Sequence, residues 1–179
     1  MMFLAEQAPK HNVMVEVGTW KGRSCSILCE LSKPGAKVFA VDTWRGSHDE
    51  AATLHKQGRD DRAGLMIEML ENLRPWINSG KLEIIPFDSA TVSSVWGRLF
   101  PNPVIDFIWI DSDHRTESVR KEIRQWLPLM RPGGMMSGHD GKWESVQAAL
   151  NLELPGWQTS LDPNDHAWFY AVPDAAPSQ

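Results

Sequence analysis

The fold follows from one stretch near the start of the chain, Val13-Met14-Val15-Glu16-Val17-Gly18-Thr19-Trp20-Lys21-Gly22-Arg23-Ser24. The apolar run Val13–Val17 indicates a strand, and a helical stretch at Gly22–Ser32 follows a turn that contains Gly18. A strand that passes through a short turn into a helix begins a βαβ unit, from which parallel sheets are built.

The alternation of strands and helices continues along the chain. Further strands are predicted over apolar runs at Lys37–Val41, Leu82–Pro86, Val104–Ile110 and Gly134–Ser137. Further helices are predicted at Arg62–Leu73 (ending before Pro75), Val92–Leu99, Ser118–Met130 and Trp143–Leu154. Two final strands, Trp157–Leu161 and Ala167–Val172, are separated by a short turn and must pair antiparallel. We therefore predict an α/β fold with a mostly parallel sheet and a C-terminal hairpin.

The length and composition fit one soluble domain. A chain of 179 residues has the size of one domain, here 1–179 with a short N-terminal segment at 1–12 and a tail at 173–179 that we expect to be disordered. The net charge of −5 argues against a protein that grips nucleic acid by its phosphates. No apolar run approaches the ~20 residues of a membrane span, so no membrane partner is expected.

Two local features bear on partners and compartment. Glu117 and Glu122 lie among a group of basic residues, which favours a solvated helix face over a basic patch: Arg115, Arg120, Lys121 and Arg124. Cys25 and Cys29 lie four residues apart on one predicted helix, where disulfide geometry is poor. We expect reduced, buried thiols and a cytoplasmic protein.

The turn after the first strand is a candidate site for a nucleoside cofactor. Gly18 would let a ligand approach the backbone amides closely, and Gly22 would open the helix. The dinucleotide pattern G-x-G-x-x-G is missing, so a plain tight turn is the alternative. Asp42 ends the second strand and could accept both ribose hydroxyls, or it could cap a helix. Trp44 could lie against the base or take part in ordinary packing.

The end of the third predicted strand offers a further contact to the base. Asp88 could accept a hydrogen bond from an adenine amino group, and Ser89 is a candidate N-cap of the next helix. Both residues can serve the cofactor and the helix at once.

Four motifs at strand ends together resemble a known family. These are Glu16–Gly22, Val41–Trp44, Ile110–His114, and Pro132–Gly134 with Gly138–Asp140. They are similar to the small bacterial class I methyltransferases, relatives of the catechol, caffeoyl-CoA and macrolide-sugar O-methyltransferases, over about residues 13–172. The resemblance implies S-adenosylmethionine (SAM) as cofactor and a seven-stranded, Rossmann-like sheet of order 3-2-1-4-5-7-6. The candidate cofactor contacts are Glu16, Gly18, Thr19, Trp20, Gly22, Ser24, Asp42, Thr43, Trp44, Asp88, Ser89 and Asp111.

Polar residues after the fourth and fifth strands form a candidate metal and catalytic site. These strands should be neighbours, so Asp111 and Asp140 could face one another, and close carboxylates repel unless a proton or cation lies between them. Mg²⁺ suits carboxylates and waters, with His139 as a third candidate ligand. Catechol-type enzymes have Asp-Asn where this chain has His139-Asp140. That departure leaves Mn²⁺, Zn²⁺ or binding by Asp140 alone as alternatives.

His114 is the candidate general base, because His titrates near neutral pH and a hydroxyl acceptor must lose a proton. The sugar methyltransferases have an Asp-x-x-His pattern that Asp111 and His114 match. The alternatives are that Asp111 caps the next helix and that His139 is a hydrogen-bonded loop residue. The predicted reaction is O-methylation of a small hydroxyl compound, such as a sugar or a phenol.

Other function classes remain open from the sequence. One is an NAD(P)-dependent oxidoreductase, and another is a SAM-binding domain without catalysis. The polar stretch Arg45–Asp61 could be a lid or contact substrate through His48, His55 or Arg59, but a mobile surface loop is the interpretation that we favour. Because segment 1–12 is short compared with larger relatives, the site is either open or covered by a second subunit of a homodimer.

Overall fold

A computed structural model describes residues 1–45, 62–101, 104–162 and 164–174 of the chain. The stretch 46–61, with His48, His55 and Arg59, and the tail residues 175–179 lie outside the described residues. The strands are β1 (Val13–Val17), β2 (Lys37–Val41), β3 (Leu82–Ile85), β4 (Ile105–Ile110), β5 (Met130–Gly138), β6 (Gln158–Thr159) and β7 (Trp168–Ala171). The helices are α1 (Met2–Gln7), η1 (Ala8–Lys10), α2 (Arg23–Leu31), α4 (Arg62–Asn78), α5 (Ser89–Leu99), α6 (Thr116–Trp126), η2 (Leu127–Leu129) and α7 (Glu144–Glu153).

The strands form one sheet in the predicted order, β3-β2-β1-β4-β5-β7-β6. Strands β1 to β5 pair in parallel, and β7 pairs antiparallel with both β5 and β6. The register places Val17 beside Val41 on one side and beside Ile110 on the other. The carboxyl ends of the three central strands therefore lie at one edge of the sheet, where ligands bind in open α/β sheets.

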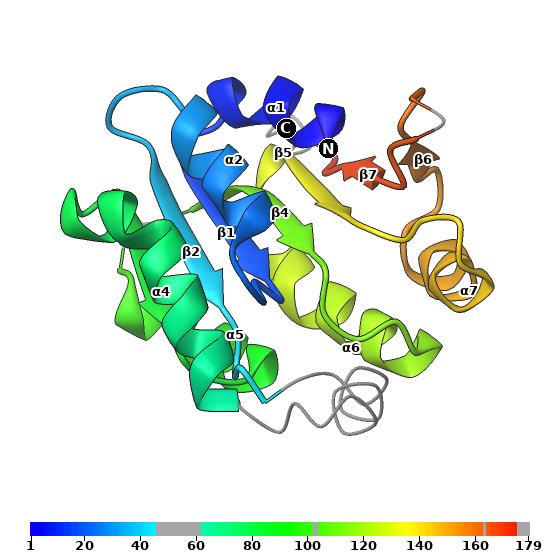
Figure 1. Ribbon diagram of the computed structural model, residues 1–179. Helices are drawn as coiled ribbons and strands as arrows, with labels where there is room; N and C mark the ends of the chain where they lie inside the picture. The colour runs from blue at the N-terminus through cyan, green and yellow to red at the C-terminus, as the bar shows by residue number, and fades with distance from the viewer. Residues whose placement is uncertain (46–61, 102–103, 163, 175–179) are drawn as a thin grey trace.

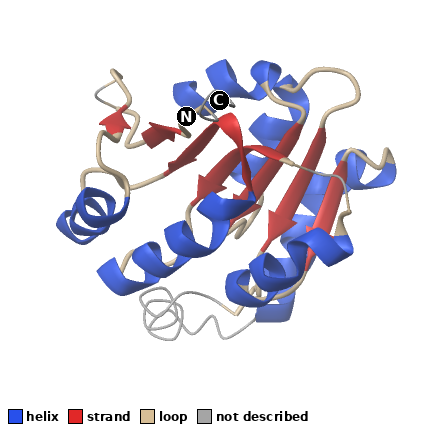
Figure 2. Cartoon of the chain, turned by 180° about the vertical axis from the view of Figure 1, so that it is seen from behind, coloured by secondary structure: helices blue, strands red, loops and turns tan. Residues whose placement is uncertain are grey.

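Helices cover both faces of the sheet, as Figures 1 and 2 show from opposite sides. Helices α1, α2 and α4 lie over one face, where the buried core includes Leu4, Leu28 and Leu73. Helices α5, α6 and α7 lie over the other face, where the buried core includes Trp96 and Trp126. Every residue of β4 is buried, as expected for a central strand covered on both faces.

Helix α4 corrects one prediction, because it continues to Asn78 with Pro75 inside it. Proline removes one helical hydrogen bond, so the sequence alone favoured an end before it. Trp76 and Ile77, which follow Pro75, pack against the core under this face. Burial of these two apolar side chains offsets the lost bond.

The short N-terminal segment, for which no element was predicted, contains helix α1 and the 3-10 turn η1. Phe3 and Leu4 of α1 are buried, and the Phe3 ring stacks on Phe169 with centroids 5.4 Å apart. The buried Asp165 carboxylate accepts a hydrogen bond from the Phe3 backbone amide at 2.8 Å. The segment therefore closes the core beside the C-terminal hairpin.

Other boundaries moved by a few residues. The fifth strand is longer than predicted and spans Met130–Gly138, and the sixth is only Gln158–Thr159. Helix α6 ends at Trp126 and a short 3-10 turn follows it. None of the described helices is long and apolar enough to cross a membrane.

Candidate active site

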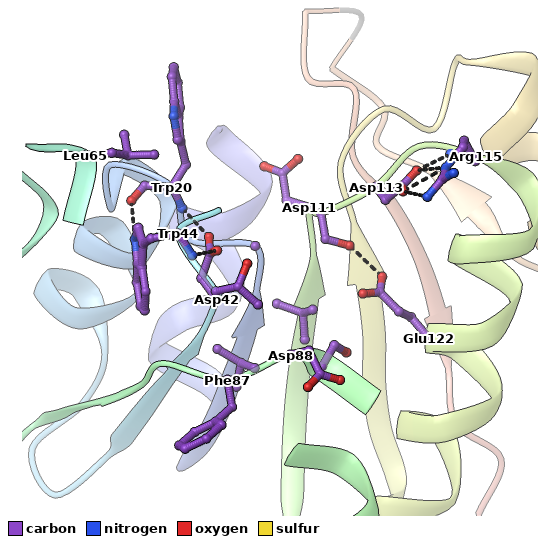
Figure 3. A pocket seen from close by; sticks show the side chains of 16 residues that line it. Trp20, Asp42, Trp44, Leu65, Phe87, Asp88, Asp111, Asp113, Arg115 and Glu122 are labelled. Carbon is purple, nitrogen blue, oxygen red and sulfur yellow. Dashed lines mark hydrogen bonds and ion pairs between the residues drawn. The ribbon is translucent and has the colours of Figure 1, made fainter. Parts of the chain in front are cut away.

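A pocket of about 380 Å³ opens at the carboxyl edge of the sheet, between the ends of β1, β2, β3 and β4. Its walls contain most of the predicted cofactor residues, namely Gly18, Trp20, Asp42, Thr43, Trp44, Asp88, Ser89 and Asp111. The remaining lining residues are Val17, Val41, Leu65, Phe87, Ser112, Asp113, Arg115 and Glu122. Figure 3 shows Asp42 on one side of this space and Glu122 on the other.

The Asp42 carboxylate organises the turn that forms one wall of the pocket. One of its oxygens accepts hydrogen bonds from the backbone amides of Thr19 and Trp20, both at 2.9 Å. Its other oxygen accepts the Trp44 amide at 2.7 Å. The Trp44 indole in turn donates to the Trp20 carbonyl at 2.9 Å. Trp20 is held with a φ of 47°, a left-handed conformation that a bulky residue rarely adopts.

Gly18 is required by the close approach of the backbone that follows β4. Its φ is 87°, and a Cβ added there would lie 2.2 Å from the Asp111 carbonyl oxygen. A side chain at this position would separate the ends of β1 and β4. The same contact fixes the start of the polar loop that follows β4 against the turn.

Four predicted cofactor residues do not line the pocket: Glu16, Thr19, Gly22 and Ser24. Glu16 is fully buried and accepts a hydrogen bond from the Ser24 hydroxyl. Burial raises the pKa of Glu16 to about 8, against the opposing effect of the Ser24 bond. A Cβ on Gly22 would meet the Leu73 side chain at 2.7 Å. These contacts pack the turn against β1, α2 and α4.

The end of β3 changes one predicted role. Asp88, rather than Ser89, is the N-cap of α5, and its carboxylate accepts the Thr91 amide at 2.9 Å. Asp is as good an N-cap as Ser, so sequence could not separate the two. The Ser89 hydroxyl accepts a hydrogen bond from the Trp126 indole at 2.8 Å. This bond ties the end of β3 to α6.

A second cluster lies next to the pocket, at the ends of β4 and β5. Ligand atoms of Asp111, His139 and Asp140 all lie within 4.8 Å of one another, so the structure brings the three predicted metal ligands together. His139 Nδ1 lies 3.1 Å from Asp140 Oδ2 and 3.9 Å from Asp111 Oδ1. Two carboxylates and an imidazole at this range suit a divalent cation.

The electrostatics of this cluster differ from one carboxylate to the other. Burial raises the pKa of Asp111 to about 6; the charge of Asp140 adds to that rise, and His139 opposes it. Hydrogen bonds with His114 and His139 hold the pKa of Asp140 well below its usual range, although burial acts the other way. A hydrogen bond to Asp140 raises the pKa of His139.

The predicted base, His114, lies beside the same cluster. Its Nε2 is 2.8 Å from Asp140 Oδ2, so Asp140 fixes the ring and would stabilise the imidazolium that forms on proton uptake. The His114 ring also lies 4.6 Å from the ring of Trp143, which is 47% exposed. Asp140 is therefore shared between both histidines.

Sequence reasoning missed Glu122, which it placed on a solvated helix face. The side chain is 9% exposed and lines the pocket. Its spacing offered a signal: Glu122 lies three residues after Val119 and four before Trp126, both buried on α6. The basic residues nearby do fit a solvated, ion-paired face, since Arg120 pairs with Glu117 and Glu153 and Arg124 also pairs with Glu153.

Comparison with known proteins identifies the family. A family model described as a methyltransferase domain matches residues 15–141, which is more than half of the chain. The chain belongs to the methyltransferase domain family. The predicted methyltransferase family and its class I strand order are confirmed, and the family match decides against the oxidoreductase alternative.

Solved structures of low sequence identity share the fold of this methyltransferase. The calicheamicin methyltransferase CalS11 has a TM-score of 0.68 at 17% identity, over 95% of this chain and 76% of that chain. The O-methyltransferase TomG of Streptomyces achromogenes, solved with SAM, has a TM-score of 0.65 at 12% identity over 95% and 78% of the two chains. The O-methyltransferase of Bacillus cereus, solved with S-adenosylhomocysteine, has a TM-score of 0.59 at 16% identity over 93% and 76%.

The two cysteines have the predicted state. Cys25 and Cys29 are free and buried on α2. The roles assigned to individual cofactor, metal and catalytic residues, the assembly state and the cytoplasmic location stay predictions.

Proposed function

We propose that this methyltransferase transfers the methyl group of SAM to a hydroxyl oxygen of a small molecule. The observation that carries the proposal is that His114 and the three candidate metal ligands lie directly beside the pocket. Asp111 belongs both to the pocket lining and to the candidate metal cluster. In the reaction the C–S bond of the sulfonium breaks and an O–C bond forms. Sulfur keeps the electron pair and becomes the thioether of S-adenosylhomocysteine.

The chain supplies groups suited to each part of this step. The turn held by Asp42 would bind the methionine and ribose portions. His114 would take the hydroxyl proton, because Asp140 lies beside its ring and stabilises the resulting positive charge. Trp143, exposed next to His114, would give an acceptor ring a surface to lie against. The acceptor is then a sugar or a phenol-like compound.

A divalent cation fits between Asp111, His139 and Asp140, since two neighbouring carboxylates are costly without one. When bound, a cation lowers the pKa of a coordinated hydroxyl. Mg²⁺ is the first candidate, and the imidazole of His139 also suits Mn²⁺ or Zn²⁺.

The test measures binding and turnover separately. Calorimetry should detect binding of SAM and of S-adenosylhomocysteine. Turnover is measured as the formation of S-adenosylhomocysteine from SAM in the presence of a panel of phenols and sugars. Chelation should lower turnover and leave cofactor binding intact, and added Mg²⁺ or Mn²⁺ should restore it. Asp111→Asn and Asp140→Asn should each abolish metal binding, whereas Glu83→Gln, at an exposed carboxylate on β3, should not.

Two results would overturn parts of this proposal. Full turnover in the presence of a chelator would show that the reaction needs no metal, and the proposed role of His114 as base would remain. SAM binding with no turnover on any hydroxyl acceptor would favour the alternative of a SAM-binding domain without catalysis.

A further inference from the structure

Glu122 is a buried acid on the wall of the cofactor pocket with no role in the proposed reaction. It projects from α6, the helix that covers the end of β4 (Figure 3). Burying a carboxyl group is unfavourable unless other groups compensate it. An acid retained at 9% exposure in a pocket wall therefore calls for a ligand or structural partner.

The partners of Glu122 in the protein are neutral hydroxyls. The Ser112 hydroxyl donates to its carboxyl at 2.7 Å, and this is the dashed line that ends on Glu122 in Figure 3. Ser89 forms a second hydrogen bond with it. Among the described residues its carboxyl is bonded to serines rather than to Lys or Arg. A carboxyl group has about four lone-pair sites, so accepting capacity is left.

The position of Glu122 marks one end of the pocket. Ser89 follows Asp88 at the end of β3, and the Trp126 indole holds Ser89 from one helical turn beyond Glu122. Glu122 therefore lies on the Asp88 side of the pocket, away from the turn that Asp42 organises. On the proposed function, this end receives the purine of SAM.

We infer that Glu122 accepts a hydrogen bond from the exocyclic amino group of the purine, alongside Asp88, and thereby selects an adenine nucleoside. This inference rests on the proposed function, since it assumes that SAM occupies the pocket. The amino group carries two hydrogens, and Asp88, at the N-cap of α5, and Glu122, on α6, would accept one each. Burial raises the pKa of Glu122 to about 7, and both of its protonation states keep an accepting oxygen.

The experiment compares S-adenosylhomocysteine with its 6-deamino analogue, which has hydrogen in place of the amino group. By calorimetry the wild type should prefer S-adenosylhomocysteine by at least about tenfold, since the analogue leaves the buried acceptor Glu122 without the amino group. Glu122→Met should weaken S-adenosylhomocysteine by about tenfold and leave the analogue within about twofold, so the preference shrinks. Glu122→Gln keeps an accepting oxygen and should keep most of the preference.

Controls separate this role from a purely structural one. Glu117→Gln, at an acid on the exposed face of the same helix, should change neither affinity. Equal weakening of both ligands by Glu122→Met would show that the acid only shapes the wall and would overturn the inference. If the wild type binds neither ligand, the proposed function itself fails, which is a distinct result.

A measurement on the wild type alone tests the same point without any variant. The N6-monomethyl analogue has one amino hydrogen instead of two. If both acids accept, it should bind about tenfold more weakly than S-adenosylhomocysteine. Equal affinity would mean that the second hydrogen has no acceptor, and the inference would be wrong.

Discussion

Asp106 and Asp111 lie at opposite ends of β4 and have opposite surroundings. Asp106 accepts the backbone amides of Asn12 and Val13 at 2.9 and 2.8 Å and pairs with Arg131. Despite burial, these donors lower its pKa. Asp111 faces Asp140 and a histidine, and its pKa is raised to about 6. The Asp106 carboxylate thus has fixed hydrogen-bond donors in the protein. The charge of Asp111 would be compensated by a bound cation or by a proton.

From this difference we expect Asp106 to serve stability and Asp111 to serve the proposed chemistry. A carboxylate with fixed amide and guanidinium partners stabilises the fold, because those partners are unpaired if it is removed. A carboxylate next to another acid costs stability, and such sites persist where they function. Three measurements test this contrast.

The largest effect is expected from Asp111→Asn. Methyl transfer should fall by about a thousandfold or more, as for loss of a metal ligand or a group that acts with the base. Its free energy of unfolding at pH 7 should change by less than about 0.5 kcal/mol or rise, because a repulsive charge is removed. Steady-state kinetics and urea denaturation check the two parts. Destabilisation with unchanged turnover would reverse the assignment.

Asp106→Ala should produce the opposite pattern. The free energy of unfolding should fall by about 2–4 kcal/mol, because two amides and the Arg131 guanidinium lose their acceptor. Affinity for S-adenosylhomocysteine should be unchanged in the folded fraction, since the residue lies at the far end of β4. Urea denaturation with a constant m-value measures the loss. A change within 0.5 kcal/mol, about what a neutral surface substitution gives, would contradict the structural role.

A smaller, pH-dependent effect is expected from Glu16. Its folded pKa of about 8 lies above the ordinary 4.5, so the wild type should lose stability as the pH rises between these values. Glu16→Gln keeps an oxygen that accepts the Ser24 hydrogen bond, and it removes the pH-dependent loss of stability because Gln does not ionise. The variant should match the wild type near pH 4.5 and exceed it increasingly at higher pH, by at least about 1–2 kcal/mol at pH 8.5. Identical pH profiles would mean that Glu16 ionises freely in the folded chain.

The sheet could be predicted from sequence because its signals are local. The ranges Val13–Val17 and Lys37–Val41 are the same in prediction and structure. The ordering of the strands came from the family resemblance, and the adjacency of Asp111 and Asp140 followed from it. These features depend on periodicity and on neighbouring strand ends.

The rest depends on tertiary contacts that one sequence does not display. Helix α4 passes through Pro75 because Trp76 and Ile77 find a core to pack against. Glu122 was predicted to lie on the surface because its side chain is charged, although its spacing from Val119 and Trp126 places it on the buried face of α6. The sequence predicted that Asp42 binds a ribose. The hydrogen bonds that its carboxylate accepts from the backbone amides of Thr19 and Trp20 are seen only in the structure.

The bonds from Asp42 to Thr19, Trp20 and Trp44 have a consequence for cofactor exchange. The backbone of this wall is already ordered by the protein's own carboxylate, so a ligand arrives at a preorganised surface. The entropy cost of ordering a loop is then met during folding rather than on binding. On the proposed function, the used cofactor would leave and a fresh one would enter while this wall keeps its shape.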